Sequence, residues 1–189
     1  MNAASLTLVL GGARSGKSAF AQKLACEGPG PVLFVATGVA VDDEMDRRIQ
    51  AHRNARPPEW RNVEAPTHLA AAIRAAQAAR TVLVDCLSFL VSNWLMSERR
   101  TTGDIDEEKT WQSIEAEIAE LEETARGKGA QLIVVSNEVG MSLVPEYPLG
   151  RSYRDLLGRA NQRVAADADA VYLMVAGIPV PIKSSPGER

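Results

Sequence analysis

The chain has 189 residues, of which 46% are hydrophobic, and this length and composition fit one globular domain better than two. Its 21 Lys and Arg against 24 Asp and Glu give a formal net charge of -3, so no basic excess is available to bind a nucleic-acid backbone. No window approaches the roughly 18 consecutive apolar residues of a membrane span, and the start lacks the pattern of a secretion signal. We therefore expect a cytoplasmic protein with a single domain over residues 1–189, in which 184–189 form a tail. The two cysteines and two histidines cannot form a structural zinc site, so any metal is expected to be hard and bound by oxygen.

Apolar runs of strand length alternate with stretches long enough for helices, which is the pattern of an α/β domain with a mainly parallel sheet. Most runs lack a polar alternation, as expected of strands that helices cover on both faces. The five predicted strands are Leu6–Leu10, Val32–Ala36, Thr81–Val84, Gln131–Val135 and Ala170–Val175. Trp60–Ala65 is a weaker strand candidate. Pro179–Ile182 is predicted to return as an antiparallel edge strand after a turn at Ala176-Gly177.

Helices are predicted between these strands, at residues 17–27, 42–56, 67–79, 88–99, 105–127 and 151–167. The longest helix carries Ile114, Ile118 and Leu121 on one apolar stripe. We expect its many charged residues to form a solvated face.

The segment after the first predicted strand matches the phosphate-binding pattern G-x-x-x-x-G-K-S/T, and a predicted helix follows it. In this pattern glycines let backbone N–H groups approach phosphate oxygens, and the helix N-terminus favours the negative charge. Lys17 is expected to reach the β and γ phosphates, and the Ser18 hydroxyl to coordinate Mg²⁺. The alternative is a glycine-rich turn with an exposed lysine. The predicted nucleotide-binding residues of this loop are Gly11, Gly12, Ala13, Arg14, Ser15, Gly16, Lys17 and Ser18.

A P-loop also needs a carboxylate near the magnesium ion, which we expect at the end of an apolar strand beside the first strand. Asp85 follows Val82-Leu83-Val84 and is predicted to be this metal-binding and catalytic residue, although an apolar strand followed by Asp is common in α/β folds. Another polar cluster, Ser136-Asn137-Glu138, ends a later strand and is expected at the same edge of the sheet. It would contact the γ phosphate or the acceptor, or else form an ordinary turn.

One histidine lies on the apolar stripe of a predicted helix. In the stretch 42–56, acidic residues begin the helix and arginines end it, which complements the helix dipole, and prolines follow. Met45, Ile49, His52 and Arg56 are spaced by four, three and four residues, so they share one face. His52 is therefore either a partly buried structural histidine or a functional group. His68 lies at a predicted helix start and is better explained as a surface or capping residue.

Taken together, these segments resemble the bifunctional adenosylcobinamide kinases and adenosylcobinamide-phosphate guanylyltransferases of cobalamin biosynthesis. The resemblance runs from residue 6 to about residue 183 and rests on the order and spacing of the motifs. These are the Gly11–Ser18 loop, Ala36-Thr37-Gly38, Asp42-Asp43-Glu44-Met45 leading to His52, Trp60 and Glu64, Asp85-Cys86-Leu87, Ser136-Asn137-Glu138-Val139-Gly140, and Arg151-x-Tyr153-Arg154-Asp155 with Gly158-Arg159-x-Asn161.

The resemblance implies a P-loop NTPase fold with a RecA-like, three-layer core, a homotrimer, and two Mg²⁺-dependent reactions. In the first, ATP or GTP phosphorylates adenosylcobinamide. In the second, GMP passes from GTP through a guanylyl-histidine, which falls on His52, to adenosylcobinamide phosphate. A neutral imidazole can attack an α phosphorus, and neighbouring arginines disfavour the imidazolium form.

The resemblance also implies nucleotide contacts outside the P-loop. They fall on Ala36, Thr37 and Gly38, on Arg53, Asn54, Ala55 and Arg56, and on Glu64. A carboxylate such as Glu64 can accept from both the N1–H and the 2-amino group of guanine. The alternative for Glu64 is an exposed glutamate at the end of a strand.

Two other functions fit the same core. A small-molecule kinase without a covalent step needs only the P-loop and Asp85, and it predicts that His52 is dispensable. A nucleotide-dependent switch protein would need mobile elements and a partner surface. The sequence offers no recognisable switch element.

Overall fold

The computed structural model describes residues 5–39, 47, 50, 53, 56–76, 79–102 and 105–184, without the side chains of 100–102. Its sheet has seven strands in the order β3-β2-β4-β5-β1-β6-β7. Neighbouring strands pair in parallel except for β6 and β7, which are antiparallel. The bounds are β1 Leu6–Gly11, β2 Val32–Ala36, β3 Arg61–Glu64, β4 Thr81–Asp85, β5 Gln131–Val135, β6 Ala170–Val175 and β7 Ile178–Lys183. This architecture confirms the predicted mainly parallel sheet and its antiparallel edge.

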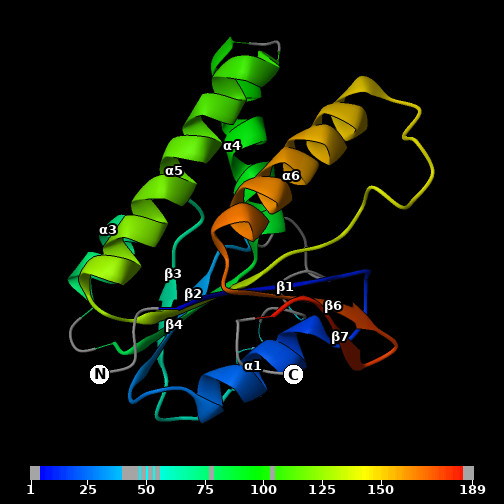
Figure 1. Cartoon of the computed structure of the whole chain (residues 1–189). Helices are drawn as coiled ribbons and strands as arrows, with labels where there is room; N and C mark the ends of the chain where they lie inside the picture. The colour runs from blue at the N-terminus through cyan, green and yellow to red at the C-terminus, as the bar shows by residue number, and fades with distance from the viewer. Residues whose placement is uncertain are drawn as a thin grey trace.

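Helices cover both faces of the sheet, which gives the predicted three layers (Figure 1). The helices are α1 Lys17–Glu27, α3 Leu69–Ala75, α4 Leu87–Thr102, α5 Glu107–Gly127 and α6 Pro148–Asp167. Successive strand residues point to opposite faces, so Val9 and Phe34 pack under α1 whereas Leu8 and Leu33 pack under the other four helices. Among the described residues, no helix combines the length and the apolar composition of a membrane span.

Four predicted helices differ from the structure at one or both ends. The helix predicted at 88–99 spans Leu87–Thr102, and the helix predicted at 105–127 begins at Glu107. The helix predicted at 67–79 is shorter, because the chain is already extended at Ala76. The helix predicted at 151–167 starts earlier, at Pro148, because proline is favoured in a first helical turn, where its missing N–H is not needed. Most of the helix predicted at 42–56 lies outside the described residues, although positions 47, 50 and 53 are helical.

The expectation that Asp85 ends a strand beside the first strand is wrong. Strand β5 pairs with both β1 and β4 and therefore separates them. The apolar pattern shows which segments are strands, but their order depends on how the helices between them cross the sheet. Asp85 thus lies two strands away from the strand that leads into the P-loop.

Two carboxylates of α5 are buried, so the expectation that its charged residues form only a solvated face is wrong for them. Glu117 is 5% exposed and accepts hydrogen bonds from the backbone N–H groups of His68 and Leu69, at 2.8 and 2.6 Å. It therefore satisfies the free donors at the start of α3. Glu122 is 7% exposed and lies 3.2 Å from Arg163 of α6. Burial raises the pKa of the Glu122 carboxyl, and Arg163 opposes this effect.

Glu122 is expected to make the stability of the fold depend on pH. The folded-state pKa of Glu122 is raised above the ordinary 4.5. Its contribution to the free energy of unfolding is therefore present at low pH and is lost as the pH rises through the folded-state pKa. The Glu122→Gln variant lacks this titration. Its free energy of unfolding, measured by urea denaturation from about pH 4 to pH 8, should therefore rise relative to that of the parent as the pH rises.

The matched control for this experiment is Glu123→Gln, because Glu123 is the next residue of α5 and is exposed. Its unfolding free energy should stay at a constant offset from the parent. A Glu122→Gln curve that runs parallel to the parent curve would contradict the assignment.

Candidate functional site

The predicted site residues on the P-loop and at the ends of β2, β3 and β4 lie at one edge of the sheet, where these parallel strands end. Ala36, the last residue of β2, is paired with Asp85 on β4 and with Glu64 on β3. Asp85 is in turn paired with Val135 of β5, and β5 pairs with β1 just before Gly11. The parallel register therefore brings the P-loop, Asp85 and Glu64 to the same edge of the sheet.

The P-loop between β1 and α1 depends on two glycines. Gly11 has φ +153°, and a Cβ atom there would lie 2.6 Å from Ser15 Oγ and 2.7 Å from the backbone oxygen of Met174. Gly16 has φ +95°, a conformation that side chains rarely adopt, and it begins α1. The turn between β6 and β7 supports the loop, because Gly177 N–H donates to the Ser15 carbonyl at 2.9 Å. The sequence analysis missed this support.

Lys17 is buried inside the loop rather than exposed to solvent. The residue is 8% exposed, and its Nζ donates to the Gly12 carbonyl at 2.6 Å. Burial lowers the pKa of Lys17, while the negative charge of Asp85 acts in the opposite direction. The alternative of a turn with an exposed lysine is therefore wrong.

Asp85 is half-buried, and its charge acts on two cations. The pKa of Lys17 and that of Arg56 are both lowered overall, because the effect of burial outweighs the raising effect of the Asp85 charge. No group of three or more His, Cys, Asp or Glu side chains within the described ranges could hold a metal. A Mg²⁺ ion that is bound mainly by substrate phosphates needs only one or two protein oxygens. The donors Asp85 and Ser18 fit such an ion.

Arg56 is fixed on the face of the sheet that α1 covers. Its guanidinium lies over the Phe34 ring, 3.5 Å from the centroid, and its NH1 donates to Asn62 Oδ1 at 2.7 Å. The Phe34 ring also stacks with Trp60, at 6.4 Å between centroids. Burial lowers the pKa of Arg56. Arg56 is thus held in place by an aromatic ring and a neighbouring strand.

Glu64 ends β3 as an exposed carboxylate. Its Oε1 lies 3.7 Å from NH1 of Arg53, and both side chains are more than half exposed. Such a surface pair contributes little to stability. The structure therefore brings Glu64, Arg53 and Arg56 together. The exposed Glu64 carboxylate is accessible to a ligand, and its position equally fits an ordinary surface residue.

Thr37 is fully buried and holds the backbone that follows Asp85. Its hydroxyl donates to the Cys86 carbonyl and accepts from the Cys86 N–H, each at 2.7 Å. Its own N–H donates to the Asp85 carbonyl at 3.2 Å. Because its hydroxyl is used in this way, the Thr37 side chain is a support for Asp85, which the sequence analysis missed. Any contact with a nucleotide here would involve the backbone or the neighbours Ala36 and Gly38.

The cluster Ser136-Asn137-Glu138 divides into two parts. The Ser136 hydroxyl is fully buried and donates to Asn161 Oδ1 at 2.6 Å, and the Asn137 N–H donates to the Ser88 hydroxyl at 2.8 Å. These contacts link β5 to α4 and α6. Glu138 lies beside the P-loop instead, because its N–H donates to the Gly11 carbonyl at 3.1 Å.

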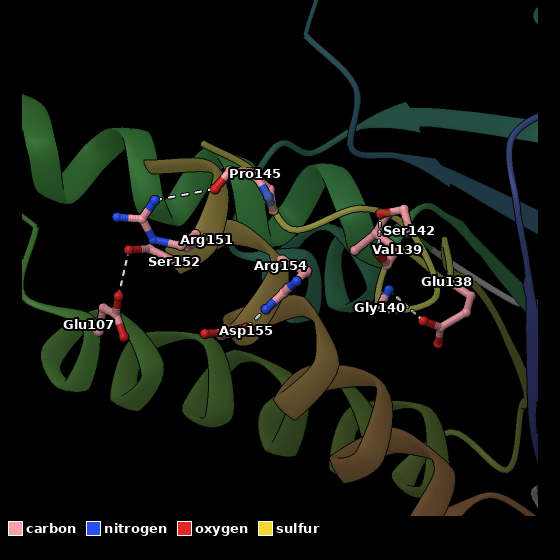
Figure 2. A network of polar contacts seen from close by, with 10 residues as sticks. All are labelled: Glu107, Glu138, Val139, Gly140, Ser142, Pro145, Arg151, Ser152, Arg154 and Asp155. Atoms are coloured by element: carbon pink, nitrogen blue, oxygen red, sulfur yellow. Dashed lines mark hydrogen bonds and ion pairs between the residues drawn. The ribbon is translucent and has the colours of Figure 1, made fainter. Parts of the chain in front are cut away.

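The loop between β5 and α6 is anchored by the motif at the start of α6 (Figure 2). Arg151 NH1 donates to the backbone oxygens of Pro145 and Glu146, at 3.2 and 2.6 Å. At the other end of the loop, Glu138 accepts from the Gly140 N–H at 2.6 Å. The arginine motif that the sequence analysis singled out thus holds a loop next to the P-loop.

The predictions for the two histidines have different outcomes. His52, Asn54 and Ala55 lie outside the described residues, so their predicted roles stay predictions. His68 is exposed and occupies the N-cap position of α3, which confirms the surface position. Its side chain makes no capping hydrogen bond, because Glu117 satisfies the helix N-terminus. The His68 ring instead contacts Trp94 edge-on, at 5.6 Å between centroids.

Comparison with known proteins gives consistent matches over nearly the whole chain. Residues 7–182 match the model of the family described as cobinamide kinase / cobinamide phosphate guanyltransferase, CobU. The chain is 42% identical to the bifunctional adenosylcobalamin biosynthesis protein CobU of Salmonella typhimurium over 185 residues, which cover 94% of this chain and 99% of the relative. It is also 42% identical to CobU of Escherichia coli K12, over 94% of this chain and 99% of the relative. The bifunctional protein CobP of Pseudomonas aeruginosa is 41% identical, over 95% of this chain and 98% of the relative.

The contacts of Thr37 predict different effects for two substitutions. Thr37→Val keeps the shape of the side chain but leaves the buried N–H of Cys86 without its acceptor, so it should lower the unfolding free energy by about 1 to 3 kcal/mol. It should also weaken the binding of Mg²⁺-nucleotide, measured by calorimetry, since the backbone of Asp85 is released. Thr37→Ser retains the hydroxyl and should bind nucleotide like the parent. A Thr37→Val protein with the parent's affinity would show that Asp85 does not depend on Thr37.

Proposed function

The chain belongs to the cobinamide kinase / cobinamide phosphate guanyltransferase family, and from this premise we propose that it carries out both reactions. It phosphorylates the aminopropanol hydroxyl of adenosylcobinamide with a nucleoside triphosphate. It then transfers GMP from GTP to the new phosphate, which gives adenosylcobinamide-GDP and pyrophosphate. The observation that carries the proposal is the P-loop with its buried Lys17, on which the charge of Asp85 acts, at the edge where the strands end.

In the kinase step, the P-loop binds the triphosphate through backbone N–H groups from Gly11 to Ser18 and through the start of α1. Lys17 leaves the Gly12 carbonyl or shares its donors with the β and γ phosphates, and so stabilises the charge that develops during transfer. Ser18 and Asp85 would hold Mg²⁺, which neutralises phosphate charge when bound. The acceptor hydroxyl attacks the γ phosphorus, the bond to the β-phosphate oxygen breaks, and the hydroxyl proton is released.

In the guanylyl step, His52 is the nucleophile. Its neutral ring nitrogen attacks the α phosphorus of GTP, a P–N bond forms, and pyrophosphate leaves. A phosphate oxygen of adenosylcobinamide phosphate then attacks the same phosphorus and breaks the P–N bond, which restores His52. The nearby arginines Arg53 and Arg56 favour the neutral imidazole that this step needs.

Guanine selection is assigned to the edge formed by β2 and β3. Glu64 can accept from both the N1–H and the 2-amino group of guanine, whereas adenine lacks these two donors. The residues Ala36, Thr37 and Gly38 after β2, and Arg53, Asn54, Ala55 and Arg56, complete the proposed nucleotide contacts. The exposed position of Glu64 at a strand end supports this assignment.

Three further predictions remain part of the proposal. They are a single domain, a homotrimer and a cytoplasmic location. Of the rival functions, a kinase without a covalent step shares the P-loop and Asp85 but does not require His52. The two functions are therefore separated by substitutions at Lys17 and His52.

Lys17→Ala should reduce the turnover of adenosylcobinamide phosphorylation by at least about 100-fold, because it removes the positive charge that stabilises the transferred phosphoryl group. The matched control is Lys23→Ala on the same helix, whose side chain is 69% exposed. It should keep the parent rate. Turnover is measured with labelled ATP, and a folded Lys17→Ala protein with normal turnover would remove the P-loop from the reaction.

His52→Asn should separate the two activities. It keeps a polar side chain but removes the nitrogen that forms the phosphoramidate. With α-labelled GTP, the acid-labile and base-stable protein adduct should disappear together with adenosylcobinamide-GDP formation. Phosphorylation of adenosylcobinamide should survive at least in part.

The control for this experiment is His68→Asn, since His68 is an exposed residue at the start of α3. It should form the adduct at the parent rate. If His52→Asn still forms the adduct, the nucleophile is another residue. If His52→Asn loses both activities and also melts at a lower temperature, His52 is a structural histidine.

A further inference from the structure

A single side chain of α4 connects the loops that follow β2 and β3. Asn93 Nδ2 donates to the Thr37 carbonyl and to the Pro66 carbonyl, each at 2.9 Å. Thr37 follows the last residue of β2, and Pro66 comes two residues after the end of β3. The two loops are therefore held at a fixed separation by one amide group.

The contacts determine which way the amide points. An asparagine NH₂ group has two hydrogens, and here each one has its own carbonyl acceptor. The reverse orientation would place the amide oxygen 2.9 Å from two carbonyl oxygens without a proton between them. Both donors of Asn93 are thus used, and a side chain without two donors on one atom cannot make the same connection.

Asn93 is also tied to the part of the site around Asp85. It lies on α4, which begins at Leu87, directly after the Asp85–Cys86 segment that the Thr37 hydroxyl holds. Thr37 therefore contacts Cys86 with its hydroxyl and Asn93 with its carbonyl. The chain of contacts runs from Asp85 through Thr37 and Asn93 to Pro66, beside Glu64.

The two loops that Asn93 connects carry the proposed guanine contacts. Ala36–Gly38 lie on one loop, and Glu64 ends the strand that leads into the other. β3 has four residues and is an edge strand, so it pairs only with β2 within the sheet. The N–H of Ala65 donates to the Ala36 carbonyl at 2.9 Å, and Asn93 provides the next connection along the chain. Without Asn93, the backbone two residues after Glu64 loses a contact that holds it relative to the end of β2.

We propose that Asn93 is a positioning residue for base selection, which fixes the Glu64 edge and the Ala36–Gly38 loop at the spacing that guanine requires. This inference rests on the proposed guanylyl transfer and on the role of Glu64 in it. Asn93 does not touch the P-loop in this arrangement. The Thr37 hydroxyl still holds the Cys86 backbone without Asn93. The loss of Asn93 therefore reduces discrimination between bases and changes phosphoryl transfer little.

The test compares GTP with inosine triphosphate, which lacks the 2-amino group that Glu64 accepts. In the parent and in Asn93→Ala, the kcat/KM for GMP-adduct formation is measured with GTP and for IMP-adduct formation with inosine triphosphate. Asn93→Ala should lower the GTP-to-ITP ratio at least roughly fivefold, within the range for loss of one good base contact. Phosphorylation of adenosylcobinamide with ATP should change less than about twofold. An equal loss with GTP and ITP, or an unchanged ratio, would overturn the proposal.

A double-mutant cycle shows whether Asn93 acts through Glu64. Glu64→Gln should lower the same ratio, and the Asn93→Ala/Glu64→Gln protein should lower it no further, because the contact that Asn93 positions is already lost. Additive losses would mean that Asn93 acts on another part of the site. Asn93→Asp provides a second variant of nearly unchanged shape that lacks both donors, and it should behave like Asn93→Ala.

The matched control is Trp94→Phe. Trp94 is the next residue of α4 and also lies near the loop after β3, but its Nε1 has no hydrogen-bond partner among the described residues. Trp94→Phe should keep the parent ratio even if it lowers stability. If the control lowers the ratio as much as Asn93→Ala, the effect comes from general loosening of α4 and the proposal fails.

Binding measurements separate this inference from the proposed function. If the parent forms no GMP adduct, guanylyl transfer fails as a function, but the Asn93 contacts still predict a lower GDP-to-IDP affinity ratio for Asn93→Ala. Calorimetry with GDP and inosine diphosphate measures this ratio without turnover. An affinity ratio equal to that of the parent would overturn the role of Asn93 by itself.

Discussion

The parallel register of β2, β3 and β4 is the constraint on which the whole site depends. Because Ala36 is paired with both Glu64 and Asp85, three chain segments leave the sheet at the same level. A shift of one residue in any of these strands would turn its side chains to the opposite face. In β2, such a shift would move Phe34 away from α1. The cores on the two faces therefore fix the register, and the register fixes the site.

The charges at this edge follow from its partial burial. Lys17 and Arg56 are cations whose pKa burial lowers, and the carboxylate of Asp85 supports the charged form of both. Arg56 is further held by the face of Phe34. These three side chains together leave an excess of positive charge in surroundings that are poorly solvated. A triphosphate is the kind of ligand that such an excess favours, since its negative charge is compensated there.

The sequence predicted the parts of the fold that depend on neighbouring residues. Strand positions, the glycine-containing turn from β1 to α1 and the β6–β7 hairpin each have a local signature of apolar runs, glycines or a turn, and the structure confirms all three. It could not predict that β5 separates β1 from β4, because strand order depends on long-range crossings. For the same reason it missed the burial of Glu117, which caps a helix 48 residues away in the chain. The supporting contacts of the Thr37 hydroxyl and of the Asn93 amide have no local signature either, since their hydrogen-bond partners lie in distant parts of the chain.

The arrangement of the sheet also bears on how one chain can carry out reactions at two different phosphorus atoms. The P-loop is built on β1 and α1, whereas the proposed base contacts are built on β2 and the edge strand β3, with β4 and β5 between them. Backbone pairing between neighbouring strands and the contacts of Thr37 with Cys86 and Asn93 connect these two regions. The P-loop is thus built on other strands than the proposed base contacts, and Asp85 on β4 lies between the two parts. In the proposed reactions, γ-phosphoryl transfer needs the P-loop and Asp85, while transfer of GMP also needs the base edge and a nucleophile placed near the α phosphorus.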